Sequence, residues 1–454
     1  MTAPAAAKAA SSPPAGYVWF VVVALSLINM VSYVERQILT LLFAPIKRDF
    51  NLTDTEVSLL AGAAFVIFFV IFGLLFGRMA DSGNRKRIIL IGAMFWGLAT
   101  TCCGLAQNFI QLFLARISVG IGEASLNPSA LSILTDTFPR DRLTRAISIY
   151  TGSQYVGAGL ALVVGGLAIH FVAMLPPIAL PGLGVLRPWQ LTFVFVGLGG
   201  LLFTIPAMFI REPVRKGLAA EPSAEEKARR RSQFAAFFGT NRRMLICHFA
   251  GFSLSSMLGF GSAAWMPTFF MRVHGWAPQD IGYVIGTIMA VMGLSGALVG
   301  GRLGEWLEQR GMKDVYFVLP MCTMSTSMLL LIGIVLSPSD KVALGLLTLS
   351  TFVGTLPLSL ITASLQVVSP NQLRGQLAAS FSFVGNILGV ASGPTVVALI
   401  TDYVYRDEHA VGLSLATTSV IVTPIVVSIL AFGRKGLKES LARAATLYAA
   451  PARA

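Results

Sequence analysis

The chain has 454 residues, of which 55% are hydrophobic and only 12% charged, and its mean hydropathy is +0.74. Soluble domains carry about 25% charged residues, so this composition excludes a set of ordinary soluble domains, a disordered chain and a cysteine-stapled secreted scaffold. The net charge of +13 would suggest nucleic acid in a soluble chain, but in a membrane protein it reflects topology, and we expect no nucleic-acid partner. The sequence predicts a polytopic membrane protein.

Twelve apolar runs are long enough to cross a bilayer as helices, which takes about 20 residues each. They cover residues 17–44, 54–77, 87–106, 108–137, 144–171, 189–210, 243–271, 278–302, 314–336, 341–368, 371–401 and 410–433. A membrane barrel would instead show short alternating segments, so the predicted fold class is all-α. We expect an N-terminal tail (1–16), a six-helix bundle (17–210), a basic linker (211–242), a second six-helix bundle (243–433) and a C-terminal tail (434–454).

Positive residues are unevenly distributed over the predicted loops. If both termini lie on one side of the membrane, that side carries 26 of the 34 Lys and Arg residues, and the other side carries six. The positive-inside rule then places both termini and the linker in the cytoplasm. We therefore expect a multi-pass protein of the cell (inner) membrane.

The two halves of the chain resemble each other at corresponding loops. Gly77 is followed by Asp81 after the second run, and Gly301 is followed by Glu305 after the eighth. Many secondary transporters are built from such repeats, with their substrate site between the repeats near the middle of the membrane. The chain has no Walker motif that would power an ATP-driven pump.

Four ionisable residues lie deep within the predicted spans: Glu35, Arg36, Arg116 and Glu123. A charge inside a span costs about 2.5–3.5 kcal/mol unless it faces protein or water and finds a partner. Arg116 and Glu123 are two helical turns apart and so share one face of their helix. The four can meet in one cavity if spans 1 and 4 are neighbours. A static ion-pair network without a role in transport remains an alternative interpretation.

A carboxylate that gains and loses an arginine partner can bind and release a proton, whereas arginine stays charged and can hold an anionic head group. We hypothesise that Glu123 is the main proton site and Glu35 its coupled partner. Arg36 and Arg116 would then alternate between these acids and an anionic substrate.

Uncharged polar residues are the remaining candidates for contacts in the cavity. They are Asn29, Tyr33, Asn127 and Gln154 in the first half and Ser359, Thr362, Gln366 and Asn386 in the second. Taken singly, each is better explained by a hydrogen bond between helices. The second half has no deep charge, and a cavity charged on one wall and apolar on the other suits an amphipath. The four histidines fall near span ends or in loops, where we expect surface or interfacial positions.

The loop from Gly77-x-x-x-Asp81 to Arg85-Lys86 resembles the hallmark of the major facilitator superfamily, with Ser82 where a basic residue is usual and Asn84 where glycine is usual. The resemblance implies two pseudo-symmetric bundles that open alternately to the two sides of the membrane. It also implies a cytoplasmic gate, for which the matching residues are Gly77, Asp81, Arg85, Lys86, Asp136 and Arg145.

Within that superfamily, Tyr33-x-Glu35-Arg36 in span 1 and Arg116-x6-Glu123 in span 4 are similar to the spinster family, which commonly has Asp where this chain has Glu35. The resemblance implies transport of lysolipids, sphingoid lipids or related amphipaths. An anion:cation symporter is the main competitor, followed by a drug-efflux carrier of the same fold and by a membrane receptor or scaffold that transports nothing.

We therefore expect a transporter rather than an enzyme, driven by the proton gradient and without a cofactor or metal. Its expected partners are a small amphipathic solute, protons and the lipid bilayer. We expect it to act as a monomer.

Overall fold

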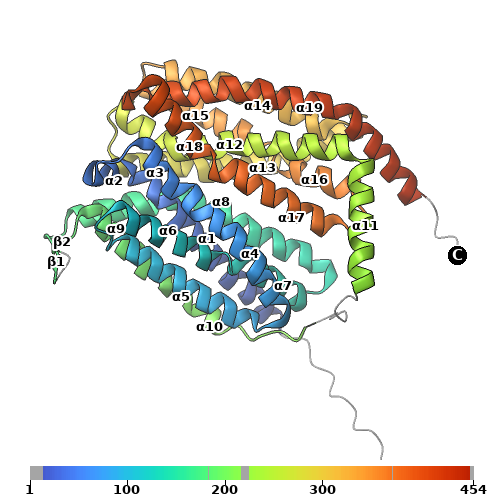
Figure 1. Cartoon of the computed structure of the whole chain (residues 1–454), viewed down its shortest axis with the longest axis horizontal. Helices are drawn as coiled ribbons and strands as arrows, with labels where there is room; N and C mark the ends of the chain where they lie inside the picture. Colours follow the sequence, from blue (N-terminus) through green and yellow to red (C-terminus); the bar gives the residue numbers. More distant parts are fainter. Residues whose placement is uncertain (1–13, 182–183, 216–223, 371, 450–454) are drawn as a thin grey trace, which may run out of the picture.

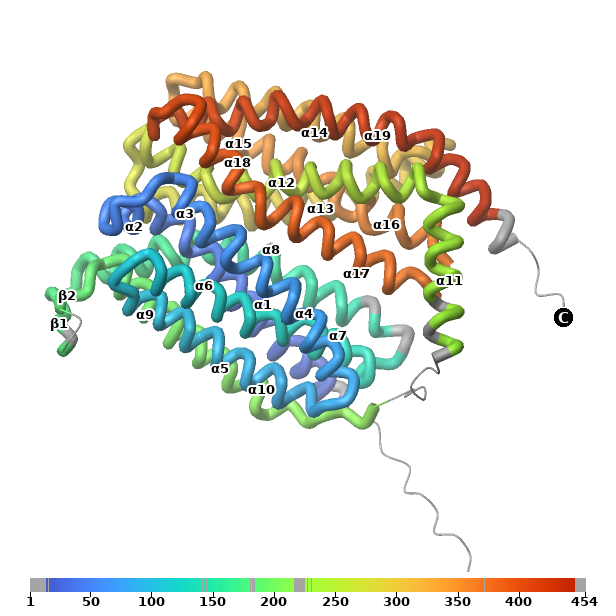
Figure 2. The backbone as a smooth tube through the Cα atoms, viewed as in Figure 1, coloured from blue at the N-terminus to red at the C-terminus, as the bar shows by residue number. Residues whose placement is uncertain are grey.

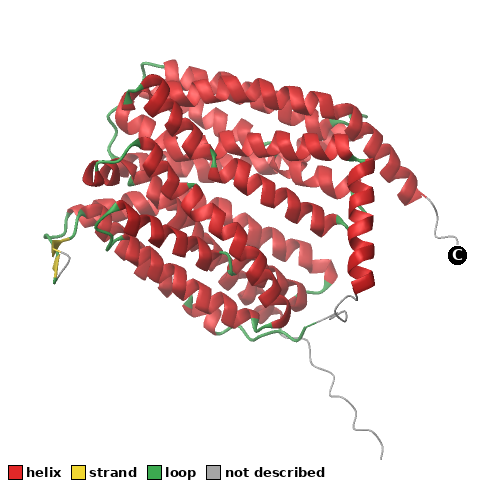
Figure 3. Cartoon of the chain, in the orientation of Figure 1, coloured by secondary structure: helices red, strands yellow, loops and turns green. Residues whose placement is uncertain are grey.

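The structure is a computed structural model that describes residues 14–181, 184–215, 224–370 and 372–449. Helices make up nearly all of it (Figure 3). Within the described residues, twelve helical stretches are long and apolar enough to cross a membrane, which confirms the predicted number and fold class. Spans 1–6 form one bundle, the N half, and spans 7–12 form the other, the C half. Figure 1 shows the N half below the C half.

The N half contains ten helices and one short hairpin between spans 5 and 6. Its elements are α1 (Ala15–Leu41), α2 (Phe43–Phe50), α3 (Asp54–Ala61), α4 (Ala63–Ser82), α5 (Arg85–Cys103), α6 (Phe109–Glu123), α7 (Leu126–Thr137), α8 (Arg140–Ala173), β1 (Ala179–Leu180), β2 (Gly184–Val185), α9 (Pro188–Leu202) and α10 (Ile205–Met208). The antiparallel pair β1–β2 is an addition to the predicted all-helical fold, and it lies in a loop.

The C half follows the linker helix α11 (Ala224–Thr240). Its elements are α12 (Arg242–Val273), α13 (Pro278–Gln309), α14 (Val315–Leu336), α15 (Asp340–Thr355), α16 (Leu358–Val368), α17 (Arg374–Gly385), the π-helix η1 (Asn386–Ala391), α18 (Gly393–Leu399), the π-helix η2 (Ile400–Tyr405), the 3₁₀ turn η3 (Glu408–Ala410) and α19 (Val411–Ala449).

Several spans are broken at points where the chain cannot continue a regular helix. Span 2 breaks at Gly62, whose φ of −96° and ψ of −93° lie outside the α region and whose position between α3 and α4 turns the chain. Span 4 breaks after Glu123, and its repeat counterpart, span 10, breaks at Pro357. Span 11 contains two π-helical segments. This geometry is rare in proteins, and where it occurs it is often at a functional site. The breaks matter because they leave backbone carbonyls free for other partners.

The predicted linker and C-terminal tail both contain helical structure. Part of the linker is helical, since α11 occupies Ala224–Thr240. The helix of span 12 continues past residue 433, since α19 reaches Ala449 and carries Arg434 and Lys438 onto Asp314 at 2.7 and 3.2 Å. Burial acts to raise the pKa of Asp314, but the hydrogen bonds from these two side chains outweigh it and hold that pKa below its usual range.

The two ends of the molecule have different structures. The linker end, at the right of Figure 1, carries α11 and the last turns of α19, whereas the hairpin end, at the left, carries α2 and the β1–β2 hairpin. The tube in Figure 2 shows α11 running across the direction of the spans at the linker end.

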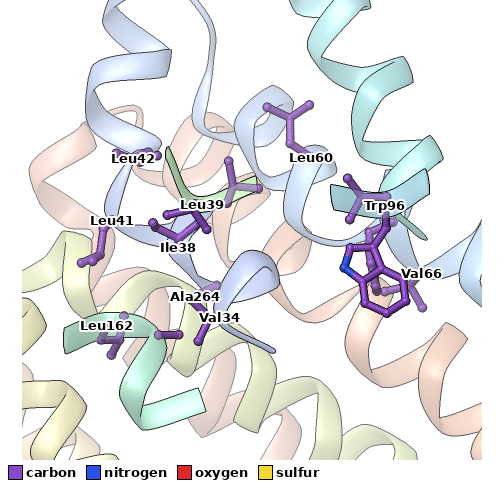
Figure 4. Packing of buried hydrophobic residues seen from close by; sticks show 14 of the residues in the cluster. Val34, Ile38, Leu39, Leu41, Leu42, Leu60, Val66, Trp96, Leu162 and Ala264 are labelled. Carbon is purple, nitrogen blue, oxygen red and sulfur yellow. The ribbon is translucent and has the colours of Figure 1, made fainter. Parts of the chain in front are cut away.

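The halves meet along α8 and α13, where glycines let the two helices approach closely. A Cβ on Gly282 would collide with the carbonyl oxygen of Leu162, and one on Gly286 would lie 2.6 Å from that of Gly159. Buried apolar side chains continue this contact: in Figure 4, Val34 of α1 lies beside Ala264 of α12, and Leu162 of α8 belongs to the same cluster. The main hydrophobic core therefore extends from one half into the other.

We predict that Gly282→Ala lowers the thermal stability of the detergent-solubilised protein by several degrees, because the methyl group must separate α8 from α13. Gly293→Ala on the same helix is the matched control, since its nearest neighbour would be Thr355 at an ordinary 3.9 Å. Equal melting temperatures for the two variants would contradict the close contact.

Candidate functional site

Arg36 and Glu123 form an ion pair between spans 1 and 4. The Arg36 Nη2 atom lies 2.7 Å from Glu123 Oε2, with side-chain exposures of 16% and 1%. The guanidinium of Arg36 also lies over the rings of Tyr33, Phe65 and Phe69, at 4.8, 4.3 and 5.3 Å from their centroids. Such contacts stabilise a buried cation. The predicted meeting of spans 1 and 4 is thus realised by this pair.

Glu35 points away from this pair although it is the neighbour of Arg36 in sequence. Its Oε2 atom accepts a 2.6 Å hydrogen bond from Thr100 of α5, and the side chain is fully buried. Oε1 faces Gly200 of α9, where any Cβ would collide with it. Glu35 therefore lies between α1, α5 and α9, inside the N half.

Arg116 is also fully buried and hydrogen-bonds the backbone. Its Nε atom donates to the carbonyl oxygen of Leu60 at 3.2 Å, and its guanidinium lies 5.6 Å from the centroid of the Phe65 ring. Among the described residues, its two Nη atoms have no hydrogen-bond acceptor. Of the four predicted charges, the structure brings two into direct contact and separates the other two.

The polar candidates in the N half connect α1 to α8 and α7. Asn29 donates to the carbonyl of Tyr150 at 3.2 Å, and Tyr33 donates to Gln154 at 2.9 Å. Asn127 accepts a 2.7 Å bond from the hydroxyl of Tyr150. These bonds fix the helices around the Arg36–Glu123 pair.

The C half contains a partly open cavity of about 340 Å³ lined by α12, α13, α14, α15, α16 and α19. Its wall is uncharged and combines flexible methionines with small hydroxyl residues. Representative lining residues are Gly259, Met266, Met289, Met324, Ser327, Met328, Ser350, Thr351 and Thr423.

None of the predicted polar residues of the C half lines that cavity. Ser359 and Thr362 are exposed on α16, Gln366 is half-buried, and Asn386 donates to the Ser382 carbonyl of its own span at 2.8 Å. The cavity residues were missed because serine, threonine and methionine are common in every span. Their arrangement around one space becomes visible only when the helices are assembled.

At the linker end, the predicted gate residues contact the N half and the start of the linker. Arg85 is buried and contacts Asp136, and it also bonds Glu212 at 2.7 Å. Lys86 donates to the Met208 carbonyl at 2.7 Å. The remaining gate candidates are Asp81, Arg145 and Gly77. The backbone carbonyl of Asp81 accepts a hydrogen bond from Arg215, and the guanidinium of Arg145 lies over the Trp19 ring. Gly77 has open space beside it, since a Cβ at this position would meet no described atom within 4 Å.

At the hairpin end, by contrast, ion pairs join the N half to the C half. Asp54 at the start of α3 is bound by both Nη atoms of Arg272 at 2.6 and 2.7 Å, and by Lys47 at 2.8 Å. Lys47 also contacts Glu408 of the C half at 2.9 Å. A carboxylate from span 11, Asp402, bonds the first turn of α3. We call Lys47, Asp54, Arg272, Asp402 and Glu408 the hairpin-end latch.

Local sequence explains why α3 presents this charge. Thr53 and Glu56 form a capping box, with bonds of 3.1 and 2.8 Å, that starts the helix at Asp54. The free N–H groups of the first turn then receive Asp402, whose carboxylate accepts from the Thr55 N–H and hydroxyl at 2.7 and 2.6 Å. A helix N-terminus favours an anion in this position. The latch was missed in the sequence because its partners come from five separate segments.

One expectation about histidine is wrong. His248 is fully buried rather than interfacial, since its Nε2 atom bonds the Ile361 carbonyl at 3.0 Å and the rings of Phe252 and Phe381 pack against it. Among the described residues, no three His, Cys, Asp or Glu side chains gather as a metal site would require.

Residues 25–394 match the Major Facilitator Superfamily, and the chain belongs to that family. Its fold and family are those of transporters, not enzymes. An efflux pump of this family from Mycolicibacterium smegmatis is 26% identical, over 88% of each chain. Protein spinster homolog 1 of Xenopus laevis is 26% identical, over 86% of this chain and 74% of the relative. The hexuronate transporter of Bacillus subtilis is 24% identical, over 84% of this chain and 87% of the relative.

A solved structure has the same fold: a bacterial homologue of the human lysosomal transporter Spinster, in an inward-facing, unoccupied conformation. The TM-score is 0.79, with 23% identity over 95% of this chain and 99% of the other. The chain is thus a major facilitator transporter that resembles spinster.

We predict that Asp54→Asn loosens the hairpin end, because Arg272 and Lys47 lose the charge that joins the halves. Breaking a buried ion pair costs about 3–5 kcal/mol. The measurement is the rate at which a membrane-impermeant maleimide labels Ser58→Cys, a buried position on α3, and it should rise severalfold.

Asp340→Asn is the matched control for this latch variant. Asp340 is also an acid at the hairpin end, but its side chain contacts Trp276 and the Lys341 N–H within the C half. Labelling that rises equally in both variants would contradict the latch.

Proposed function

We propose that this protein is a proton-coupled secondary transporter that moves an amphipathic, lipid-like solute of the lysolipid or sphingoid type by alternating access. The main support is the contrast between the two halves. The N half holds the Arg36–Glu123 pair, and the C half holds an uncharged cavity. An anionic or zwitterionic head group would compete for Arg36, and an acyl chain would enter the cavity.

The dimensions and chemistry of the C-half cavity agree with an acyl chain. Ligand pockets usually measure about 300–1,000 Å³, and this one has about 340 Å³. Met266, Met289, Met324 and Met328 supply flexible apolar side chains, which adapt to ligands of irregular shape. The hydroxyl groups around them include Ser327, which has no hydrogen-bond partner among the described residues.

Proton coupling is proposed from the competition for Arg36. In this structure Glu123 holds Arg36, and the pair is nearly neutral as a whole. When a substrate anion takes the guanidinium, Glu123 loses its counter-charge and a proton would replace it. Glu35 lies one residue before Arg36 and would feel the same change through their shared helix.

The orientation is part of the proposal. We infer that the linker end, with both termini, faces the cytoplasm of a cell whose inner membrane holds the protein, in agreement with the excess of Lys and Arg there. The hairpin-end latch would then close the outer side, so that this conformation faces inward.

The second candidate is an organic-anion symporter, favoured by the similarity to the hexuronate transporter. A small polyanion would bind best between cationic side chains on both walls of its site, whereas the lining of the C-half cavity is uncharged. A multidrug efflux carrier would use the same cavity with a broader range of solutes. A receptor or scaffold would leave the four deep charges without a role in solute movement.

We predict that a short-chain lysolipid drives proton flux in proteoliposomes with a trapped pH dye, and that Glu123→Gln reduces this flux to the leak rate. The amide cannot exchange a proton, although it keeps the size of the side chain. Glu439→Gln, an exposed change on α19, is the control and should keep the parental flux.

Flux with a sugar acid alone would move the protein to the organic-anion class. Lysolipid flux that survives in Glu123→Gln would refute the coupling role of that residue. If no lipid, drug or organic anion of a broad panel drives proton flux through the parent protein, the result would favour the receptor or scaffold.

We predict that Gly259→Phe weakens lysolipid-driven flux at least several-fold and affects long acyl chains more than short ones. A Cβ on Gly259 meets no atom within 4 Å, so the ring would enter the cavity without moving the backbone. The matched control is Gly345→Phe on α15, which is equally free of neighbours but lies outside the cavity lining. Equal flux in the two variants would contradict an acyl-chain site in the C half.

A further inference from the structure

The short helix α3 joins the N half to the C half at the hairpin end, beside the larger α8–α13 contact. Asp54 and Thr55 in its first turn bind Arg272 and Asp402, and Ser58 lies 3.2 Å from Thr395. A rigid shift of α3 would therefore break all these contacts together and loosen the hairpin end.

The far end of α3 ends at the break in span 2. The break at Gly62 lies against the π-helix η1, because a Cβ on Gly62 would collide with the carbonyl oxygen of Ala391. α3 is thus held between the C half at one end and a non-helical joint at the other. Such a joint lets α3 move without the rest of its span.

Arg116 reaches this same break from the charged site. Its Nε atom donates to the carbonyl oxygen of Leu60, two residues before Gly62, and the side chain is fully buried. Its Nη atoms have no acceptor among the described residues, so they remain available to an anion. One guanidinium therefore bonds the gate helix through Nε and keeps both Nη atoms unpaired in the described part of the chain, within electrostatic range of Glu35 and Glu123.

We propose that Arg116 is a positioning residue that couples the charge state of the deep carboxylates to the hairpin-end latch through the Leu60 carbonyl. While the carboxylates are protonated or otherwise paired, Arg116 binds Leu60 and holds α3 closed. When they are ionised and unpaired, they draw the guanidinium away, and α3 is released. The inference rests on the proposed function for the role of this coupling in transport. The bond from Arg116 to the Leu60 carbonyl is itself a feature of the structure.

The groups that act on Arg116 come from three neighbouring helices. Glu35 and Arg36 belong to α1, Cys103 to α5 and Glu123 to its own helix, α6, and Phe65 of α4 lies beside its guanidinium. The two carboxylates attract Arg116 and Arg36 repels it. A pH response of the gate therefore reports on this group as a whole.

The test measures opening of the hairpin end by the distance between spin labels at Arg48→Cys on α2 and Lys341→Cys on α15. Both positions are exposed, and neither belongs to the latch. The background has Cys102, Cys247 and Cys322 replaced by alanine and keeps Cys103, which is fully buried and lies near Arg116. Between pH 6 and pH 8, we expect the ratio of open to closed molecules to rise about tenfold, the effect of one hydrogen bond from a charged group.

Arg116→Gln should raise the open fraction at low pH and abolish its pH dependence, because the neutral amide cannot be drawn to the carboxylates. Arg116→Lys should restore part of the pH response, because it keeps the charge. Thr55→Val is the control: it removes one bond from Asp402 and loosens the latch, but it leaves Arg116 intact and should keep the response.

A parental pH response in Arg116→Gln would overturn the inference. Loss of the response in Thr55→Val would overturn it as well, since any loosening of α3 would then suffice. Lysolipid-driven proton flux in the same vesicles separates the two proposals: a pH-responsive gate without flux supports the coupling and rejects the substrate, whereas flux with an unchanged response in Arg116→Gln does the reverse.

Discussion

The burial of charge inside a membrane-spanning bundle is the constraint on which the rest of this structure depends. Each deep charge costs at least about 2.5–3.5 kcal/mol unless the protein supplies a partner. The N half supplies three different ones: a carboxylate for Arg36, a hydroxyl for Glu35 and a backbone carbonyl for Arg116. Each of these bonds requires the helices to approach closely. At Gly200, the missing side chain of α9 leaves the space that Glu35 occupies. The sequence around the site is therefore restricted in size as much as in charge.

The two halves share a topology but divide the chemistry. The repeat is visible in the breaks of spans 4 and 10, yet Glu123 ends α6 at the first break and Pro357 begins α16 at the second. One half has a charged interior and the other an uncharged cavity. An amphipathic molecule has the same division, so the asymmetry within a symmetric fold is the physical argument for the substrate class. In the proposed function, the hairpin-end latch would decide from which side such a molecule can enter.

Much of the fold was predictable because the length and hydropathy of a span are properties of one segment. The twelve spans and the cost of the deep charges follow from the sequence in this way, and so does the neighbourhood of Arg36 and Glu123, once spans 1 and 4 are adjacent. The direction of Glu35 was not predictable, since it depends on Thr100 and Gly200 from two other spans. The burial of His248 depends in the same way on packing between spans. The cavity of the C half is made of residues that every span contains, so only their assembly distinguishes it.

The breaks in the helices explain how a charge deep in the membrane can act on a gate at the surface. A regular helix uses its own carbonyls and offers none to a neighbour. At Gly62 the chain leaves the helix, and the Leu60 carbonyl becomes a partner for Arg116 while the break itself packs against the η1 π-helix of the other half. In the proposed coupling, the signal then passes through the backbone of α3 to Asp54 and Thr55. The helix α3 is short enough to move as one rigid piece with these two residues. A side-chain relay of the same length would need several more buried polar residues, each with its own cost of burial. Placing one arginine at one helix break is the less expensive arrangement, and it makes the gate sensitive to whatever competes for that arginine.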